Sequence, residues 1–151
     1  MNEPTTNHET LFMLLADFET ELDTPVVPGE SSRWISDVRA AFDLLSTYLR
    51  GAVLSDHLAQ FSIIASEDDE LLPRVAEVKR MDGEIHGACE RLSKQISQLE
   101  QRLNAASQFP DDERRSLVHE GQQLLASIRQ QEIAIQTWSQ EAILRDRGVV
   151  D

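Results

Sequence analysis

The sequence is poor in residues that cross-link a chain or anchor it in a membrane. It contains one cysteine, which excludes a disulfide within the chain and gives no sign of a zinc knuckle. No apolar stretch approaches the roughly 20 residues of a membrane-spanning helix. The first ten residues have neither the basic nor the apolar segment of a secretory signal. We therefore expect a soluble, cytoplasmic protein with no membrane partner.

Basic residues are also scarce. The chain has 14 lysines and arginines against 27 aspartates and glutamates, so its formal charge is −13. Such a charge repels nucleic acids and anionic membranes, and neither is an expected partner. Hydrophobic residues make up 40% of the chain, which argues against wholesale disorder. A length of 151 residues suits one domain with a single core, here residues 1–151.

Catalytic signatures are missing as well. The sequence has no Gly-x-Ser-x-Gly nucleophile motif, no phosphate-binding loop and no dinucleotide fingerprint. Cys89 lies among apolar residues, where a cysteine behaves as a small hydrophobe rather than as a nucleophile. We expect a protein that is not an enzyme.

What the chain does have is helical periodicity along nearly its whole length. Apolar residues recur every three or four positions, which places them on one face of a helix. The predicted helices cover residues 8–23, 33–65, 71–106 and 111–145. Helices of this kind joined by short connections predict an all-α, antiparallel up-down-up-down four-helix bundle. A long coiled-coil hairpin that dimerises is the structural alternative.

The third predicted helix carries a carboxylate on its apolar face. That face comprises Val75, Val78, Asp82, Ile85, Cys89, Leu92, Ile96, Leu99 and Leu103. A carboxylate among apolar neighbours costs free energy unless it is paired, protonated or bound to an ion. Asp82 is therefore the first candidate for a functional residue.

Each of the other helices also has a polar residue near its apolar face: His57, Gln131 and His8. At a rise of about 1.5 Å per residue, His57 and Asp82 lie at similar distances from the connection between their helices. Gln131 falls within roughly two turns of Asp82. We expect a polar layer in which His57 pairs with Asp82, directly or through Gln131. Polar layers in helical bundles are also where metal and cofactor sites are built.

These polar positions resemble the hemerythrin-like (HHE cation-binding) family. The pattern of that family has a histidine on the first helix, His-x3-Glu on the second, His-x3-His on the third and His-x4-Asp on the fourth. The matching positions here are His8 and residues 57–61, 82–86 and 131–136, with an acidic stretch at 67–73. The resemblance implies a four-helix bundle with a non-haem di-iron centre.

The departures from the family pattern remove most of that centre. Phe61 stands where the resemblance implies a bridging carboxylate, and Gln131 and Gln136 replace a histidine and a second carboxylate. Glutamine is a weak, neutral ligand, so little charge is left to balance two iron ions. The ligand set that remains is His8, His57, Asp82 and His86, which we interpret as vestigial. His86 lies beside the apolar face, where exposure to solvent is the alternative.

The acidic run at residues 67–70 has two interpretations. It lacks the alternating ligands and the central glycine of a calcium loop, and a solvated helix end is the simpler explanation.

For the whole chain we predict a non-enzymatic, hemerythrin-like bundle without a cofactor, acting as a regulatory or interaction module for an unidentified protein. One alternative is a sensor that holds a single iron or zinc ion. A second alternative is an acidic chaperone or adaptor of the secretion type.

Overall fold

All regular secondary structure in the described part of the protein is helical. The computed structural model describes the backbone of residues 7–67, 72–105 and 110–148, and the side chains within them except those of 7, 61–67, 105, 142–143 and 145–148. Its elements are α1 (Asn7–Asp23), α2 (Ser31–Tyr48), the π-helical turn η1 (Leu49–Val53), α3 (Leu54–Glu67), α4 (Leu72–Ala105) and α5 (Asp111–Gly148). No strand occurs in these ranges, which confirms the predicted all-α class. Within them, no helix is both long and apolar enough to cross a membrane.

The second predicted helix, 33–65, is interrupted by a π-helical turn that the sequence did not reveal. The residues flanking η1, Tyr48 and Leu54, have right-handed helical dihedrals, so α2, η1 and α3 form one continuous rod. Twelve residues separate the buried Leu45 and His57, which would point about 120° apart on a regular α-helix. The wider turn of η1 takes up part of this difference, because a π-helix closes its hydrogen bonds over five residues. Both side chains can then be buried.

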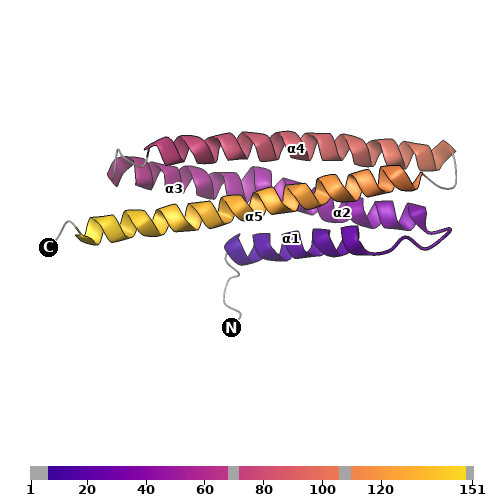
Figure 1. Ribbon diagram of the computed structural model, residues 1–151, viewed down its shortest axis with the longest axis horizontal. Helices are drawn as coiled ribbons and strands as arrows, with labels where there is room; N and C mark the ends of the chain where they lie inside the picture. The colour runs from indigo at the N-terminus through magenta and orange to yellow at the C-terminus, as the bar shows by residue number, and fades with distance from the viewer. Residues whose placement is uncertain (1–6, 68–71, 106–109, 149–151) are drawn as a thin grey trace.

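The helices lie side by side, but α1 accompanies only part of the assembly (Figure 1). It packs on α2, η1 and α5, whereas α3 packs on α4 and α5. At the surface between α1 and α5, Glu19 pairs with Arg129 (2.7 Å) and Gln122 donates a hydrogen bond to Asp23. Beyond the start of α1, Figure 1 shows α3, the beginning of α4 and the end of α5 extending together.

A tight turn comes directly before α2. The backbone N–H of Glu30 donates to the carbonyl of Val27 (2.9 Å) across Pro28 and Gly29. Gly29 has φ of 86°, which is the left-handed conformation that the third position of a type II turn requires. The proline fixes the preceding φ, so this pair of residues sets the direction in which α2 begins.

Two separate apolar clusters fill the interior. The larger comprises Leu11, Leu15, Phe18, Leu22, Trp34, Ile35, Val38, Phe42, Leu45, Val53, Ile85, Leu92, Ile96, Leu99, Leu117, Leu124, Leu125 and Ile128. The smaller comprises Val75, Val78 and Ile135, with Trp138 packed against it. The first four members of the larger cluster recur every three or four positions along α1, as the helical periodicity of the sequence predicts, and all are buried.

A polar cluster in the candidate functional site

His57 is the centre of a polar cluster formed by α3, α4 and α5. Only 3% of this residue is exposed. Its Nδ1 lies 3.1 Å from Asp82 Oδ1 on α4, and its Nε2 lies 3.1 Å from Glu132 Oε1 on α5. A carboxylate can only accept a hydrogen bond, so both ring nitrogens must donate and the ring is an imidazolium. The predicted pairing of His57 with Asp82 is present.

The two carboxylates determine the protonation of His57. Burial alone disfavours the charged ring and lowers its pKa. The hydrogen bonds and negative charges of Asp82 and Glu132 outweigh that effect and raise the pKa of His57 to about 9. At neutral pH the cluster is therefore an imidazolium between two carboxylates, so one negative charge in the cluster remains without a matching positive charge.

Gln131 completes the surroundings of Asp82. The residue is 1% exposed, and its Nε2 donates to Asp82 Oδ1 and approaches the Val78 carbonyl at 3.4 Å. Asp82 therefore accepts hydrogen bonds from an imidazolium and from an amide. This satisfies a carboxylate that is itself only 23% exposed.

Glu132 is the member of the cluster that the sequence analysis missed. It follows Gln131 and lies one position off the apolar face of α5, where charged residues are normally solvated. Its side chain is nevertheless only 19% exposed, because it reaches back to His57. Its other oxygen, Oε2, lies 3.9 Å from Nδ1 of His8, a residue with a 56% exposed side chain at the start of α1. His8 is thus at the outer edge of the cluster.

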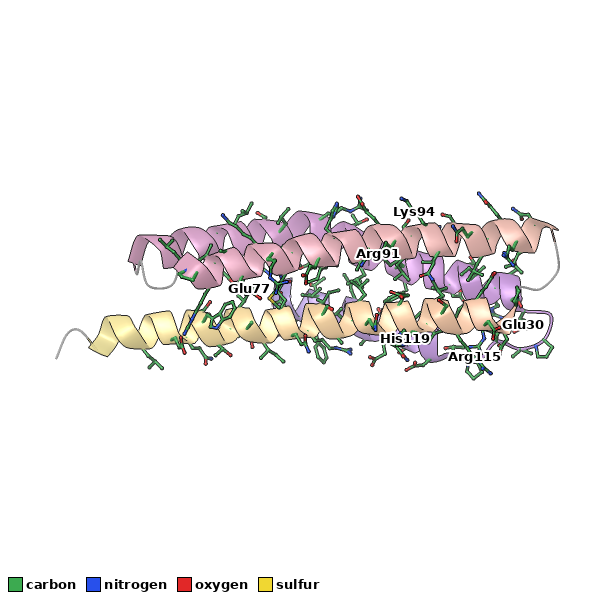
Figure 2. All side chains as sticks on the ribbon, turned by 45° about the horizontal axis from the view of Figure 1, so that its top comes forward. Glu30, Glu77, Arg91, Lys94, Arg115 and His119 are labelled. Carbon is green, nitrogen blue, oxygen red and sulfur yellow. The ribbon has the colours of Figure 1, made fainter. Side chains whose placement is uncertain are left out.

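The remaining histidines lie elsewhere. His86 has a 55% exposed side chain and pairs with Glu90 on the same helix (3.3 Å). This agrees with the solvent-facing alternative for His86. His119 is exposed on α5 (Figure 2), within hydrogen-bonding distance of Gln123 and twelve positions before Gln131 in the sequence.

Cys89 packs against the larger apolar cluster, as predicted. Burial raises the pKa of its thiol to about 11, although the charge of Arg50 acts in the opposite direction. A thiol with a raised pKa is a poor nucleophile at neutral pH.

The predicted ligand set does not fit a di-iron centre. A metal-bound imidazole needs a nitrogen lone pair, and both nitrogens of His57 are engaged as donors to carboxylates. Among the described residues, no group of three or more His, Cys, Asp or Glu side chains is arranged to hold a metal ion. A single ion would have to displace a proton and one carboxylate from His57. The side chain of Phe61 and residues 68–70 of the acidic run lie outside the described residues, and Gln136 is exposed.

Comparisons with models of protein families, with curated proteins and with solved structures gave no significant match. The resemblance to the hemerythrin-like family therefore stays a prediction based on the sequence motifs.

Proposed function

We propose that this chain is a non-enzymatic, antiparallel four-helix bundle of the hemerythrin-like type that serves as a protein-interaction module. In this proposal the imidazolium–carboxylate cluster around His57 replaces a metal centre. The order of the helices and the side-by-side packing of α1, the α2–α3 rod, α4 and α5 support the bundle. The contacts of His57 with two carboxylates support the replacement.

The observation that carries the interaction role is a groove along the outer surface of α1 and α2, which we call the α1–α2 groove. Its apolar lining comprises Leu14, Ala40, Ala41, Leu44, Tyr48 and Ala52. Leu44 is 63% exposed, and the small alanines beside it leave room for a side chain from a partner. A helix can bind such a surface by laying its apolar face into the groove.

The charges of the α1–α2 groove indicate the chemistry of that partner. Four carboxylates line it, from Asp17, Glu21, Asp37 and Asp43, and no basic residue does. Only Asp43 has a cation near it, Arg39 at 3.7 Å; within the described part of the chain the other three have no ion pair. We therefore expect the partner to present a basic amphipathic helix, with apolar residues facing Leu44 and lysines or arginines facing the carboxylates.

Binding of a model peptide tests this function. The probe is a synthetic amphipathic helix with leucines on one face and lysines on the other, measured by fluorescence anisotropy at low salt. Leu44→Asp should weaken binding by about tenfold or more, since it removes an apolar anchor. Leu58→Asp is the matched control, because Leu58 is also exposed (55%) and lies outside the groove. Equal binding by both variants, or equal binding of a peptide with glutamates in place of lysines, would contradict the proposal.

A further inference from the structure

A cavity of about 630 Å³ lies beside the π-helical turn, and we call it the π-turn cavity. Its walls come from α2, η1 and α4, and it reaches Asp82 and Gln131 of the polar cluster. The volume falls within the range of about 300–1,000 Å³ that is usual for small-molecule sites. The cavity shares Asp43 with the α1–α2 groove, but the other residues of that groove do not line the cavity.

The interior of the cavity is mainly apolar. Phe42, Leu49, Val53 and Ile85 line it together with Cys89. Leu49 and Val53 belong to η1, so the π-helical turn itself forms part of the wall. Single π-helical turns inside α-helices are frequently found at functional sites. The interior therefore suits an apolar group.

The carboxylates of the cavity form ion pairs, whereas its two cations form none in the part of the chain that the structure describes. Its three carboxylates each have a partner: Asp43 has Arg39, Asp82 has His57 and Glu90 has His86. The two cations that line the cavity, Arg50 and Lys94, have no carboxylate partner within the described residues.

Arg50 is held at the cavity by its own helix. Its Nε donates to the Ser46 carbonyl at 3.4 Å, and its charge acts on the Cys89 thiol inside. Two cations that have no carboxylate partner among the described residues, beside an apolar cavity, favour a ligand with a negative charge over one with a positive charge.

We propose that the π-turn cavity binds an amphipathic anion, with its apolar tail against Phe42, Val53 and Ile85 and its acidic head near Arg50 and Lys94. The ligand is a small molecule with one acidic group on an aliphatic chain. This second site is independent of the proposed interaction function, since neither cation lines the α1–α2 groove.

Two probes with the same tail and different heads test the proposal, decanoate and decyl phosphate. Binding is measured by calorimetry and by the rate at which Cys89 reacts with a thiol reagent. We expect saturable binding of at least one probe and slower labelling of Cys89, because the tail covers the thiol. Binding of one probe alone would identify the preferred acidic head. Decyltrimethylammonium, with a cationic head, should neither bind nor protect.

Substitutions test whether Arg50 and Lys94 themselves bind the acidic head or whether the overall charge of the protein determines binding. Arg50→Gln and Lys94→Gln should each weaken binding about tenfold. Arg91→Gln is the control, because Arg91 lies on α4 near Lys94 but lines a different surface, toward α5 (Figure 2). All three residues are exposed, so the variants should fold. Binding that is absent for both anions, equal for the cationic probe, or insensitive to Arg50→Gln and Lys94→Gln would overturn the proposal.

Discussion

The region that contains α1 and the region that contains α3 are built differently. In the first, residues of α1, α2, α4 and α5 together form the larger apolar cluster, and α1 packs directly on α2 and α5. In the second, α3 packs on α4 and α5, and the described apolar interior consists of Val75, Val78 and Ile135 with Trp138 beside them. Stability is seldom uniform across a fold, and it follows the amount of buried apolar surface. We expect the α1 region to hold most of the stability of this protein.

The polar cluster lies between these two regions. On α5, Gln131 separates Ile128 of the larger cluster from Ile135 of the smaller one. On α4, Asp82 likewise separates Ile85 from Val78. The cluster therefore divides a core that would otherwise be continuous. The charged residues therefore set where one apolar cluster stops and the next begins.

The largest expected effect comes from a cavity in the α1 region. Phe42→Ala removes a ring that packs on Phe18 with centroids 5.8 Å apart, and should cost about 3–5 kcal/mol of unfolding free energy. Val78→Ala in the α3 region should cost about 2 kcal/mol, since it removes fewer buried carbon atoms. Urea denaturation of both variants checks this. Equal losses would show that the two regions contribute alike.

A pH titration of stability should isolate the cluster between the regions. The pKa of His57 rises from 6.5 in the unfolded chain to about 9 in the folded protein. The folded state therefore binds more protons between these pH values, and the contribution of about 3 kcal/mol is complete below pH 6.5 and lost by pH 9. His57→Gln should remove this pH dependence, and His86→Gln should keep it. A wild-type stability that is constant or rising across this window would refute the assignment.

Replacing the charges should join the two apolar clusters. Asp82→Leu alone leaves His57 with Glu132 only, and should cost about 2 kcal/mol at neutral pH. The double variant His57→Leu/Asp82→Leu should recover most of that loss, because apolar residues of suitable size can replace a buried ion pair. Thermal unfolding of the two variants gives the comparison. A double variant that is less stable than the single one would mean that the charges stabilise the fold.

Two glycines provide the smallest test. A Cβ at Gly121 would lie 2.6 Å from Leu22 Cδ1 in the α1 region, so Gly121→Ala should cost about 1–2 kcal/mol through overpacking. A Cβ at Gly83 meets nothing within 4 Å, and Gly83→Ala should gain about 0.5–1 kcal/mol through helix propensity. Melting temperatures that shift in the same direction for both variants would argue against the tight contact at Gly121.

The sequence predicts those features that depend on one helix at a time. The buried face of α1 follows from residue spacing. The similar heights of His57 and Asp82 along their helices follow from the helical rise per residue. Glu132 was missed because its long side chain reaches the cluster from a position off the apolar face. The π-helical turn was missed because it depends on aligning Leu45 and His57 with other helices. His86 illustrates what motif spacing does not predict. It is four residues from Asp82 in the sequence, but its side chain faces solvent and pairs with Glu90.

The central claim is that His57 is a charged imidazolium held by Asp82 and Glu132. The most direct measurement is an NMR titration of the His57 ring nitrogens from pH 5 to 10, with assignment by the His57→Gln variant. We expect both nitrogens to remain protonated at neutral pH and the ring to titrate at a pKa of about 9. A ring that titrates at or below its ordinary pKa of 6.5, with one nitrogen unprotonated at neutral pH, would contradict it.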